Sequence, residues 1–106
     1  MPKVILTPEA IEDILEIYNY ILEQDGEERA EAILNRLEQA ACSLDTLPLR
    51  GKLPEELVPF GNRKVREIQE TPWRIFYRPE EKEIFVFRVV DGRRAVKELL
   101  EKHLLL

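Results

Sequence analysis

Apolar residues in the first half of the chain recur at the spacing of an α-helix. Between Thr7-Pro8 and Asp25-Gly26 they stand at every third or fourth position, which predicts an amphipathic helix. Thr7 can cap this helix, Pro8 can occupy its first turn and Gly26 can end it. The main apolar stripe comprises Ile11, Ile14, Leu15, Tyr18, Ile21 and Leu22.

A second helix follows almost at once and continues until Pro48 breaks its pattern. Its apolar stripe comprises Ala30, Ile33, Leu34, Leu37, Ala41 and Leu44. The Asp25-Gly26 connection is so short that the two helices must form an antiparallel hairpin. A short apolar run at residues 3–6 precedes the hairpin and reads as a strand.

Ile17 and Tyr20 lie beside the main stripe of the first helix and widen its apolar surface. A broad surface facing the core is the commoner explanation of such a pattern. The alternative is a groove for a helix or strand of a partner, because contiguous apolar patches on small proteins usually mark interaction sites. The sequence leaves both interpretations open.

The second half of the chain has the pattern of β-strands. After a connection rich in proline and glycine at residues 47–62, strands are predicted at 65–69, 73–78 and 84–90. The tail at 94–106 has helical spacing. The predicted order of elements is therefore β-α-α-β-β-β-α.

The strand at 84–90 is apolar on both faces except at Arg88, which is expected of the central strand of a sheet. We expect its core residues to be Phe85, Val86, Phe87 and Val89. The strand at 73–78 divides its side chains between two faces. One face has Trp73, Ile75 and Tyr77, and the other has Arg74, Phe76 and Arg78.

Composition favours one cytoplasmic domain spanning residues 1–106. A chain of this length with 44% hydrophobic residues suits a single compact core. The lone Cys42 cannot form an internal disulfide, and no N-terminal apolar run resembles a signal peptide or membrane span. We expect Cys42 to be a small buried side chain, because it lies beside an apolar stripe.

Charge is unevenly distributed along the chain. Residues 1–59 contain 5 Lys or Arg and 13 Asp or Glu, a net charge of −8, whereas residues 60–106 contain 11 and 8, a net charge of +3. Such a dipolar molecule can steer an anionic partner to one face. With an overall charge of −5, strong direct binding to nucleic acid is not expected, because that affinity depends on many phosphate contacts.

Motifs for catalysis, cofactors or metals are sparse. The single histidine, His103, has no cysteine or carboxylate cluster at metal-ligand spacing, so we expect no metal and no cofactor. Its expected role is structural, at the partly exposed end of the last helix. Ser43, the only serine, lies inside a predicted helix and supports no catalytic triad.

Several segments together resemble the RelE/ParE superfamily of bacterial toxins from type II toxin-antitoxin modules. They are the helical hairpin, Gly-Lys-Leu-Pro-Glu-Glu-Leu at 51–57, Trp-Arg-Ile-Phe-Tyr-Arg at 73–78 and Val-Val-Asp-Gly-Arg-Arg at 89–94. The resemblance spans nearly the whole chain. It implies an α+β fold in which a small twisted antiparallel β-sheet packs against the N-terminal helical hairpin, and it implies neutralisation by an antitoxin.

Members that resemble RelE cut messenger RNA on the ribosome, whereas members that resemble ParE poison DNA gyrase without a nuclease centre. Arg74 and Arg94 match two phosphate-binding arginines of the RelE-like branch. Leu99 and Leu100, however, stand where that branch has a catalytic tyrosine, and Asp91 replaces a histidine. The resemblance therefore favours a ParE-like, non-enzymatic gyrase poison. The alternatives are a ribosome-dependent endoribonuclease and an inactive antitoxin-binding scaffold.

Arginines and a tyrosine of the strands are the candidate residues for binding an anionic target, because guanidinium groups grip carboxylates and phosphates through forked hydrogen bonds. The candidates are Arg74, Tyr77, Arg78, Arg93 and Arg94, with the last two preferred. The competing explanation for Arg74, Arg78 and Arg88 is a structural role in cross-strand ion pairs, and we assign that role to Arg88 and Arg78. The carboxylate partners in such pairs would be Glu67, Glu70 and Glu83.

The widened apolar surface of the first helix is the candidate antitoxin-binding surface. A segment that folds on binding would cover apolar side chains that a monomer leaves exposed. The candidate residues are Ile14, Ile17, Tyr18, Tyr20 and Ile21.

Overall fold

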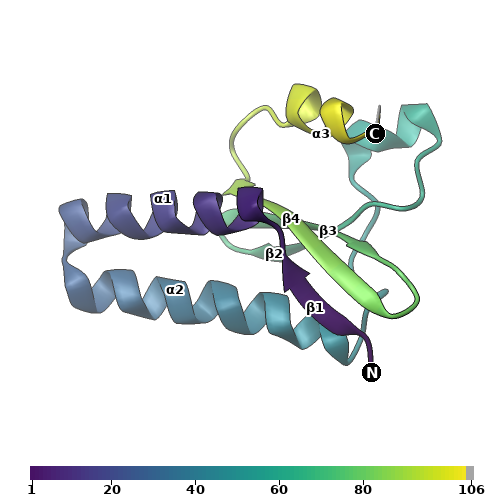
Figure 1. Ribbon diagram of the computed structural model, residues 1–106. Coiled ribbons are helices and arrows are strands. Elements are labelled where there is room, and N and C mark those ends of the chain that lie inside the picture. Colours follow the sequence, from purple (N-terminus) through teal and green to yellow (C-terminus); the bar gives the residue numbers. More distant parts are fainter. Residues whose placement is uncertain (105–106) are drawn as a thin grey trace.

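The computed structural model describes residues 1–104, with side chains as far as Lys102, and has a helical hairpin packed on a four-stranded sheet (Figure 1). The predicted α+β class and order of elements are confirmed. Two short 3₁₀ helices, η1 and η2, are added in the connection before the sheet. The elements are β1 (Lys3–Leu6), α1 (Pro8–Asp25), α2 (Glu27–Cys42), η1 (Ser43–Asp45), η2 (Glu55–Phe60), β2 (Arg66–Glu70), β3 (Trp73–Pro79), β4 (Glu83–Asp91) and α3 (Lys97–Leu104).

The strands lie in the order β1-β4-β3-β2, so β4 is central, as predicted. β2, β3 and β4 are antiparallel to one another, which agrees with the expected sheet. β1 instead pairs with β4 in parallel, with Val4 opposite Ile84, and makes the sheet mixed. The chain between β1 and β4 includes the helical hairpin and is long enough for the two strands to run in the same direction. A tight turn between them would have required antiparallel pairing.

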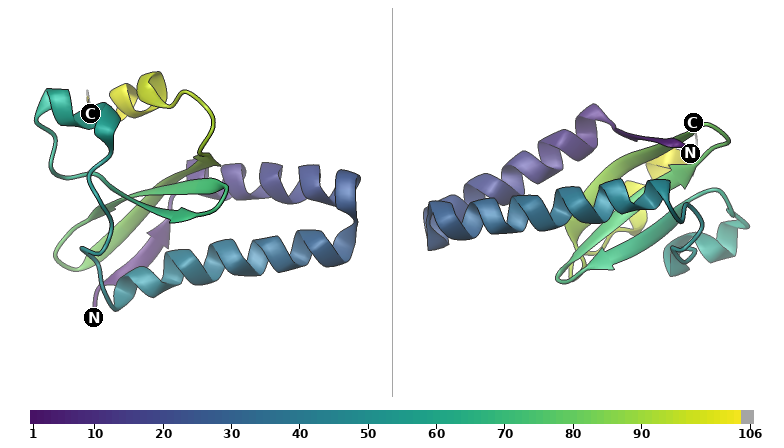
Figure 2. Two further views of the ribbon diagram at one scale, coloured as in Figure 1. Left: turned by 180° about the vertical axis from the view of Figure 1, so that it is seen from behind. Right: turned by 90° about the horizontal axis from the view of Figure 1, so that it is seen from below.

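Local signals set the ends of the helices as predicted. The Thr7 hydroxyl accepts a hydrogen bond from the backbone N–H of Ala10, and Pro8 begins α1. Gly26, with φ of 92°, joins the two helices in a conformation that favours glycine. The tip of the hairpin extends past the sheet in both Figures 1 and 2. Among residues 1–104, no helix has the length and apolar character that a membrane crossing requires.

The main core lies between the hairpin and one face of the sheet. The sheet contributes Trp73, Ile75 and Tyr77, which confirms that these residues of β3 share a face. The predicted stripe of α2 is also confirmed, since Leu34 is partly buried and the other members are fully buried. These other members are Ala30, Ile33, Leu37, Ala41 and Leu44.

The buried face of α1 is rotated from the predicted stripe. Ala10, Ile14 and Ile21 are buried, and Ile17 and Tyr18 pack at the margin of the core. Three residues of the predicted stripe are exposed, so the stripe does not coincide with the buried face. They are Ile11 (46% exposed), Leu15 (53%) and Leu22 (38%). The apolar arc of α1 is wider than one contact can cover, and periodicity does not show which part of the arc packs.

A smaller core covers the other face of the sheet, beneath η2 and α3. The rings of Phe76 and Phe87 lie with centroids 6.5 Å apart. Other members are Leu57, Val65, Val90, Val96 and Leu100. Among the predicted core residues of β4, only Phe85 is partly rather than fully buried. The predicted position of the His103 side chain lies outside the described residues.

Cys42 is exposed, so the prediction of a buried thiol was wrong. It follows Ala41, which is 2% exposed. One residue along an α-helix turns the side chain by about 100°. A position beside a buried stripe is therefore not itself buried.

The connection between α2 and β2 is held against the edge of the sheet. The backbone N–H of Gly51 donates to the Tyr77 hydroxyl at 2.9 Å, and Lys52 exchanges two backbone hydrogen bonds with Glu67. A Cβ atom at position 51 would lie 2.6 Å from both the Glu67 carbonyl oxygen and the Tyr77 hydroxyl. Only glycine allows this close approach.

Phe87→Ala should lower the free energy of unfolding by about 3–5 kcal/mol, because the ring is buried in the smaller core. Urea denaturation followed by circular dichroism measures this change. Phe60→Ala is the matched control, since Phe60 is 52% exposed and should cost less than about 0.5 kcal/mol. Equal midpoints for the two variants would show that the smaller core does not stabilise the fold.

Candidate functional site

Tyr77, one of the predicted target-binding residues, is fully buried in the main core. Its hydroxyl accepts the hydrogen bond from Gly51, and burial raises its pKa above the ordinary value. Tyr77 therefore anchors the connection before β2 and does not face a target, so its assignment to a binding surface was wrong. The alternation along β3 showed which side chains share its face, but not that the hairpin covers that face.

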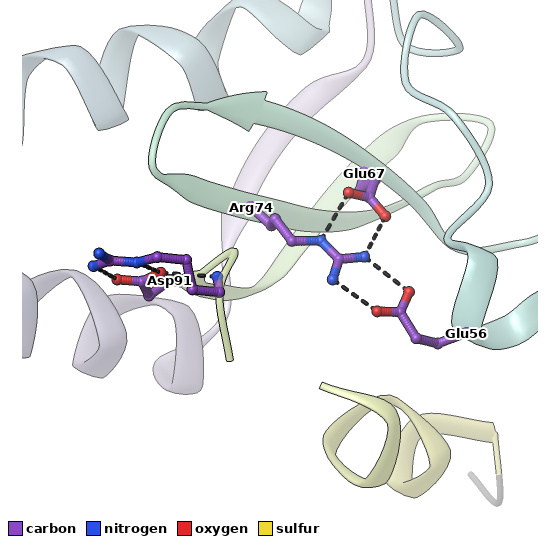
Figure 3. Close-up of polar contacts among 5 residues, drawn as sticks. Glu56, Glu67, Arg74 and Asp91 are labelled. Carbon is purple, nitrogen blue, oxygen red and sulfur yellow. Dashed lines mark hydrogen bonds and ion pairs between the residues drawn. The ribbon is translucent and has the colours of Figure 1, made fainter. Parts of the chain in front are cut away.

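Arg74 is held by two carboxylates (Figure 3). It donates from Nε and Nη2 to Glu67 at 2.9 and 2.6 Å, and from Nη1 and Nη2 to Glu56 at 2.7 and 2.8 Å. Glu67 comes from the neighbouring strand β2, and Glu56 comes from η2. The hydrogen bonds with Glu56, and then those with Glu67, raise the pKa of Arg74. The same interaction with Arg74 lowers the pKa of Glu56.

This network is largely buried at Glu67 and Arg74, is more open at Glu56, and ties η2 to the sheet. The Glu67 side chain is 1% exposed and the Arg74 side chain is 13% exposed, and the guanidinium carbon lies 4.8 Å from the centre of the Phe76 ring. These carboxylates occupy four of the five N–H donors of Arg74, so an external anion would have to compete with them. Glu67 was a predicted partner of the strand arginines, whereas Glu56 was missed because it lies in an irregular segment.

Arg78 and Arg88 take part in ion pairs. Arg78 lies 3.3 Å from Glu80 in an exposed pair. Arg88 donates from Nε and Nη2 to Asp13 of α1 at 2.7 and 3.0 Å. The structural role predicted for Arg88 is therefore confirmed, but its predicted cross-strand glutamate partners were wrong. A carboxylate from a helix distant in sequence takes their place.

Arg93 and Arg94 lie in the exposed turn after β4. Arg93 donates from Nε and Nη2 to Asp91 at 3.0 and 2.6 Å, and its backbone N–H donates to the same carboxylate at 2.9 Å. Figure 3 shows the contacts of Asp91. The hydrogen bonds from Arg93 lower the pKa of Asp91 to about 2, so this carboxylate is ionised at neutral pH and stays available to Arg93. The Arg94 side chain is exposed and makes no hydrogen bond or ion pair with any described residue.

A groove of about 540 Å³ separates α1 from this end of the sheet. Apolar side chains line it, and three arginines from two parts of the chain stand at it. The apolar residues include Ile17, Ile21, Ile33, Trp73, Val89 and Val90. The arginines are Arg29, Arg93 and Arg94. The preferred arginine pair and the apolar surface of α1, which the sequence presents as separate features, therefore border one groove.

The candidate antitoxin-binding residues of α1 are divided by this arrangement. Ile17, Tyr20 and Ile21 line the groove, and Tyr20 is 65% exposed. Tyr18 is partly buried and is not among the lining residues. Ile14 is only 6% exposed and belongs to the main core, so its assignment to a binding surface was wrong. A residue in the middle of the apolar arc is the most deeply packed and the least available to a partner.

Sequence reasoning missed Asp13, Arg29 and Trp73 as groove residues. Asp13 had a detectable signal, because a carboxylate inside an apolar arc needs a partner. Arg29 and Trp73 had none, since their proximity results from the packing of the hairpin on the sheet. No group of three or more His, Cys, Asp or Glu side chains that could hold a metal ion occurs in the described part of the chain. The groove itself offers apolar side chains for packing and three arginines that can bind anionic groups.

Known proteins resemble this chain along almost its full length. The family model for the ParE toxin of the type II toxin-antitoxin system, parDE, matches residues 4–96. The chain belongs to the ParE toxin family. Toxin ParE3 of Caulobacter vibrioides is 28% identical over 102 residues, which cover 96% of this chain and 98% of that protein. A solved structure titled as the chromosomal ParDE system from P. aeruginosa has a TM-score of 0.72 at 21% identity, and the match covers 86% of this chain and 96% of the other. This last similarity shows a shared fold.

Membership of the ParE family confirms the resemblance inferred from the sequence. This ParE chain is the toxin of a type II toxin-antitoxin system, and such a system includes an antitoxin. The matched residues contain the groove, the Arg74 network and the Arg93-Arg94 turn, and they end just before α3.

Arg74→Ala should lower the free energy of unfolding by about 3–5 kcal/mol, because Glu67 would remain as a buried charge without its partner. Urea denaturation at neutral pH measures the loss. Arg78→Ala is the matched control and should change stability by less than about 1 kcal/mol, because its ion pair with Glu80 is exposed. If Arg74→Ala were as stable as Arg78→Ala, Arg74 would not serve to hold η2 on the sheet.

Proposed function

We propose that this ParE toxin poisons DNA gyrase by binding rather than by catalysis, and that its antitoxin neutralises it by occupying the groove beside α1. The toxin's family supports a gyrase target, and the pairing of Arg74 supports a non-enzymatic mode. The exposed arginine turn and the apolar groove supply the contacts of the two partners.

The pairing of Arg74 with Glu56 and Glu67 is the observation that argues against a nuclease. A ribonuclease needs a free cationic group to stabilise the charge that develops on phosphate in the transition state. Arg74 matches such a position by resemblance, yet its guanidinium already binds Glu56 and Glu67 and is 13% exposed. A phosphate would have to compete with these two carboxylates for Arg74.

The carboxyl groups around Arg74 are also poorly suited to proton transfer. Cleavage by attack of a 2′-hydroxyl group requires a residue that exchanges protons near neutral pH. The hydrogen bonds from Arg74 lower the pKa of Glu56, which keeps this carboxyl ionised and makes it a poor general acid. The net charge of −5 likewise disfavours a protein that must bind ribosomal RNA.

Arg93 and Arg94 are the proposed target-binding pair. The Asp91 carboxylate accepts hydrogen bonds from Arg93 within the turn, and the Arg94 side chain is exposed and makes no hydrogen bond or ion pair with any described residue. A fixed turn that presents guanidinium groups suits carboxylates or phosphates of a target. Arg78 is paired with Glu80 and is therefore a weaker candidate. It remains one because this exposed ion pair can be broken at little cost.

Arg93→Ala combined with Arg94→Ala should abolish toxicity without unfolding the chain, because exposed charges contribute little to stability. Purified wild-type toxin should inhibit gyrase supercoiling and trap cleaved DNA, and the double variant should do neither. Arg63→Ala is a control at an exposed arginine outside the site. In a reconstituted translation reaction, wild-type toxin should leave ribosome-bound messenger RNA intact.

Discrete cuts in ribosome-bound messenger RNA would overturn the gyrase assignment in favour of a ribonuclease. A toxin that affects neither gyrase nor translation, yet still binds its antitoxin, would be an inactive scaffold. Full activity of the double variant on gyrase would reject the arginine pair and leave the gyrase target itself standing.

Tyr20→Glu should weaken binding of the antitoxin by at least about tenfold, because it places a charge beside the apolar wall of the groove. Isothermal titration calorimetry with the protein encoded beside this toxin measures the affinity. Phe60→Glu is the matched control, since Phe60 is also an exposed aromatic residue but lies on η2. Unchanged affinity for Tyr20→Glu would place the antitoxin elsewhere.

A further inference from the structure

The helical hairpin carries a second apolar surface, which is partly exposed and adjoins the main core at Tyr18 and Leu34. Ile11, Leu15 and Leu22 of α1 are 46%, 53% and 38% exposed, and Tyr18 lies between them partly buried. In chain order, these four residues of α1 are separated by four, three and four positions. This spacing aligns them in a single row along the helix, as in the seam of a coiled coil.

This row faces away from the groove. Ile17 and Ile21 line the groove, whereas Tyr18 and Leu22 follow them by one residue and turn by about 100°. On α2, Leu34 follows the groove residue Ile33 in the same way. Because the helices are antiparallel neighbours, the same step along each turns to the same side of the hairpin. The outer face comprises Ile11, Leu15, Tyr18, Leu22 and Leu34.

Acidic side chains border the outer face on both helices. On α1, Glu12 and Glu23 follow Ile11 and Leu22 by one residue and are exposed. On α2, Glu31 and Glu38 lie three residues before and four residues after Leu34, which makes them its neighbours on the helix surface. Both are also exposed.

No basic residue of the hairpin balances these acids. α1 contains neither Lys nor Arg. α2 contains only Arg29 and Arg36. Arg29 lines the groove, and Arg36 donates from Nε to Glu70 at 2.9 Å and from Nη2 to the Thr71 carbonyl oxygen at 3.2 Å. The outer face is therefore apolar along its centre and negative along its borders.

We propose that the outer face of the hairpin docks a basic amphipathic helix of a partner protein. Apolar residues of that helix, three and four positions apart, pack on the row, and its Lys or Arg side chains reach the acidic borders. A second copy of this chain is a poor occupant, because pairing α1 with α1 opposes acids with no basic residue between them. This inference does not depend on the gyrase target.

The test uses the full chain and a synthetic helical peptide as long as α1, with leucines at three- and four-residue spacing flanked by lysines. Fluorescence anisotropy should show binding that weakens as salt is raised to about 0.5 M, where charges are screened. Leu15→Ser and Ile11→Ser should each weaken binding by about tenfold or more. Phe60→Ser, at an exposed site on η2, should leave binding unchanged.

Charge is tested by Glu23→Gln combined with Glu31→Gln, which should lower affinity and reduce its dependence on salt. A peptide with glutamates in place of lysines should bind at least about tenfold more weakly. Equal binding of the two peptides would overturn the proposal, as would equal effects of Leu15→Ser and Phe60→Ser. Sedimentation measures self-association of the free chain. Self-association that Leu15→Ser removes would show that a second copy of the chain, and not a basic helix, occupies the outer face. Circular dichroism verifies that each variant is folded.

Discussion

Asp13 fixes the position of the helical hairpin on the sheet. It is a carboxylate within the apolar arc of α1, and it accepts two hydrogen bonds from Arg88 and one from the backbone N–H of Val89. Its side chain is 10% exposed, and a charge so poorly hydrated requires partners. These bonds set the rotation of α1 and its position along β4. The groove depends on that placement, because Asp13 lines it together with Ile17 and Ile21 further along the helix.

A comparable interaction organises the connection before the sheet. Arg74 of β3 binds Glu56 of η2, as Arg88 of β4 binds Asp13 of α1. In each case an arginine of the sheet holds a carboxylate from an element packed against the sheet. A domain of this length has small cores, and directional ion pairs specify how its layers meet where apolar contact alone is less selective. Removal of one partner is costly because the other remains as a poorly hydrated charge.

Local signals in the sequence predicted the elements, but not which surfaces meet. The caps at Thr7 and Gly26, the stripe of α2 and the faces of β3 depend on neighbouring residues, and all were predicted correctly. Burial of Ile14 and Tyr77 depends on what covers them. The partners of Arg74 and Arg88 come from distant segments, so strand neighbours alone could not identify Glu56 or Asp13. The groove joins α1 to the Arg93-Arg94 turn only after the layers pack.

Some of the opposite charges on the two halves of the chain neutralise one another in ion pairs that hold the halves together. Asp13 and Glu56 of the acidic half bind Arg88 and Arg74 of the basic half. The predicted dipole is therefore reduced, and what remains is localised at two places. Positive charge is presented by the turn at Arg93 and Arg94, and negative charge borders the outer face of the hairpin. Because these places lie on different sides of α1, the molecule can meet partners of opposite charge without one excluding the other.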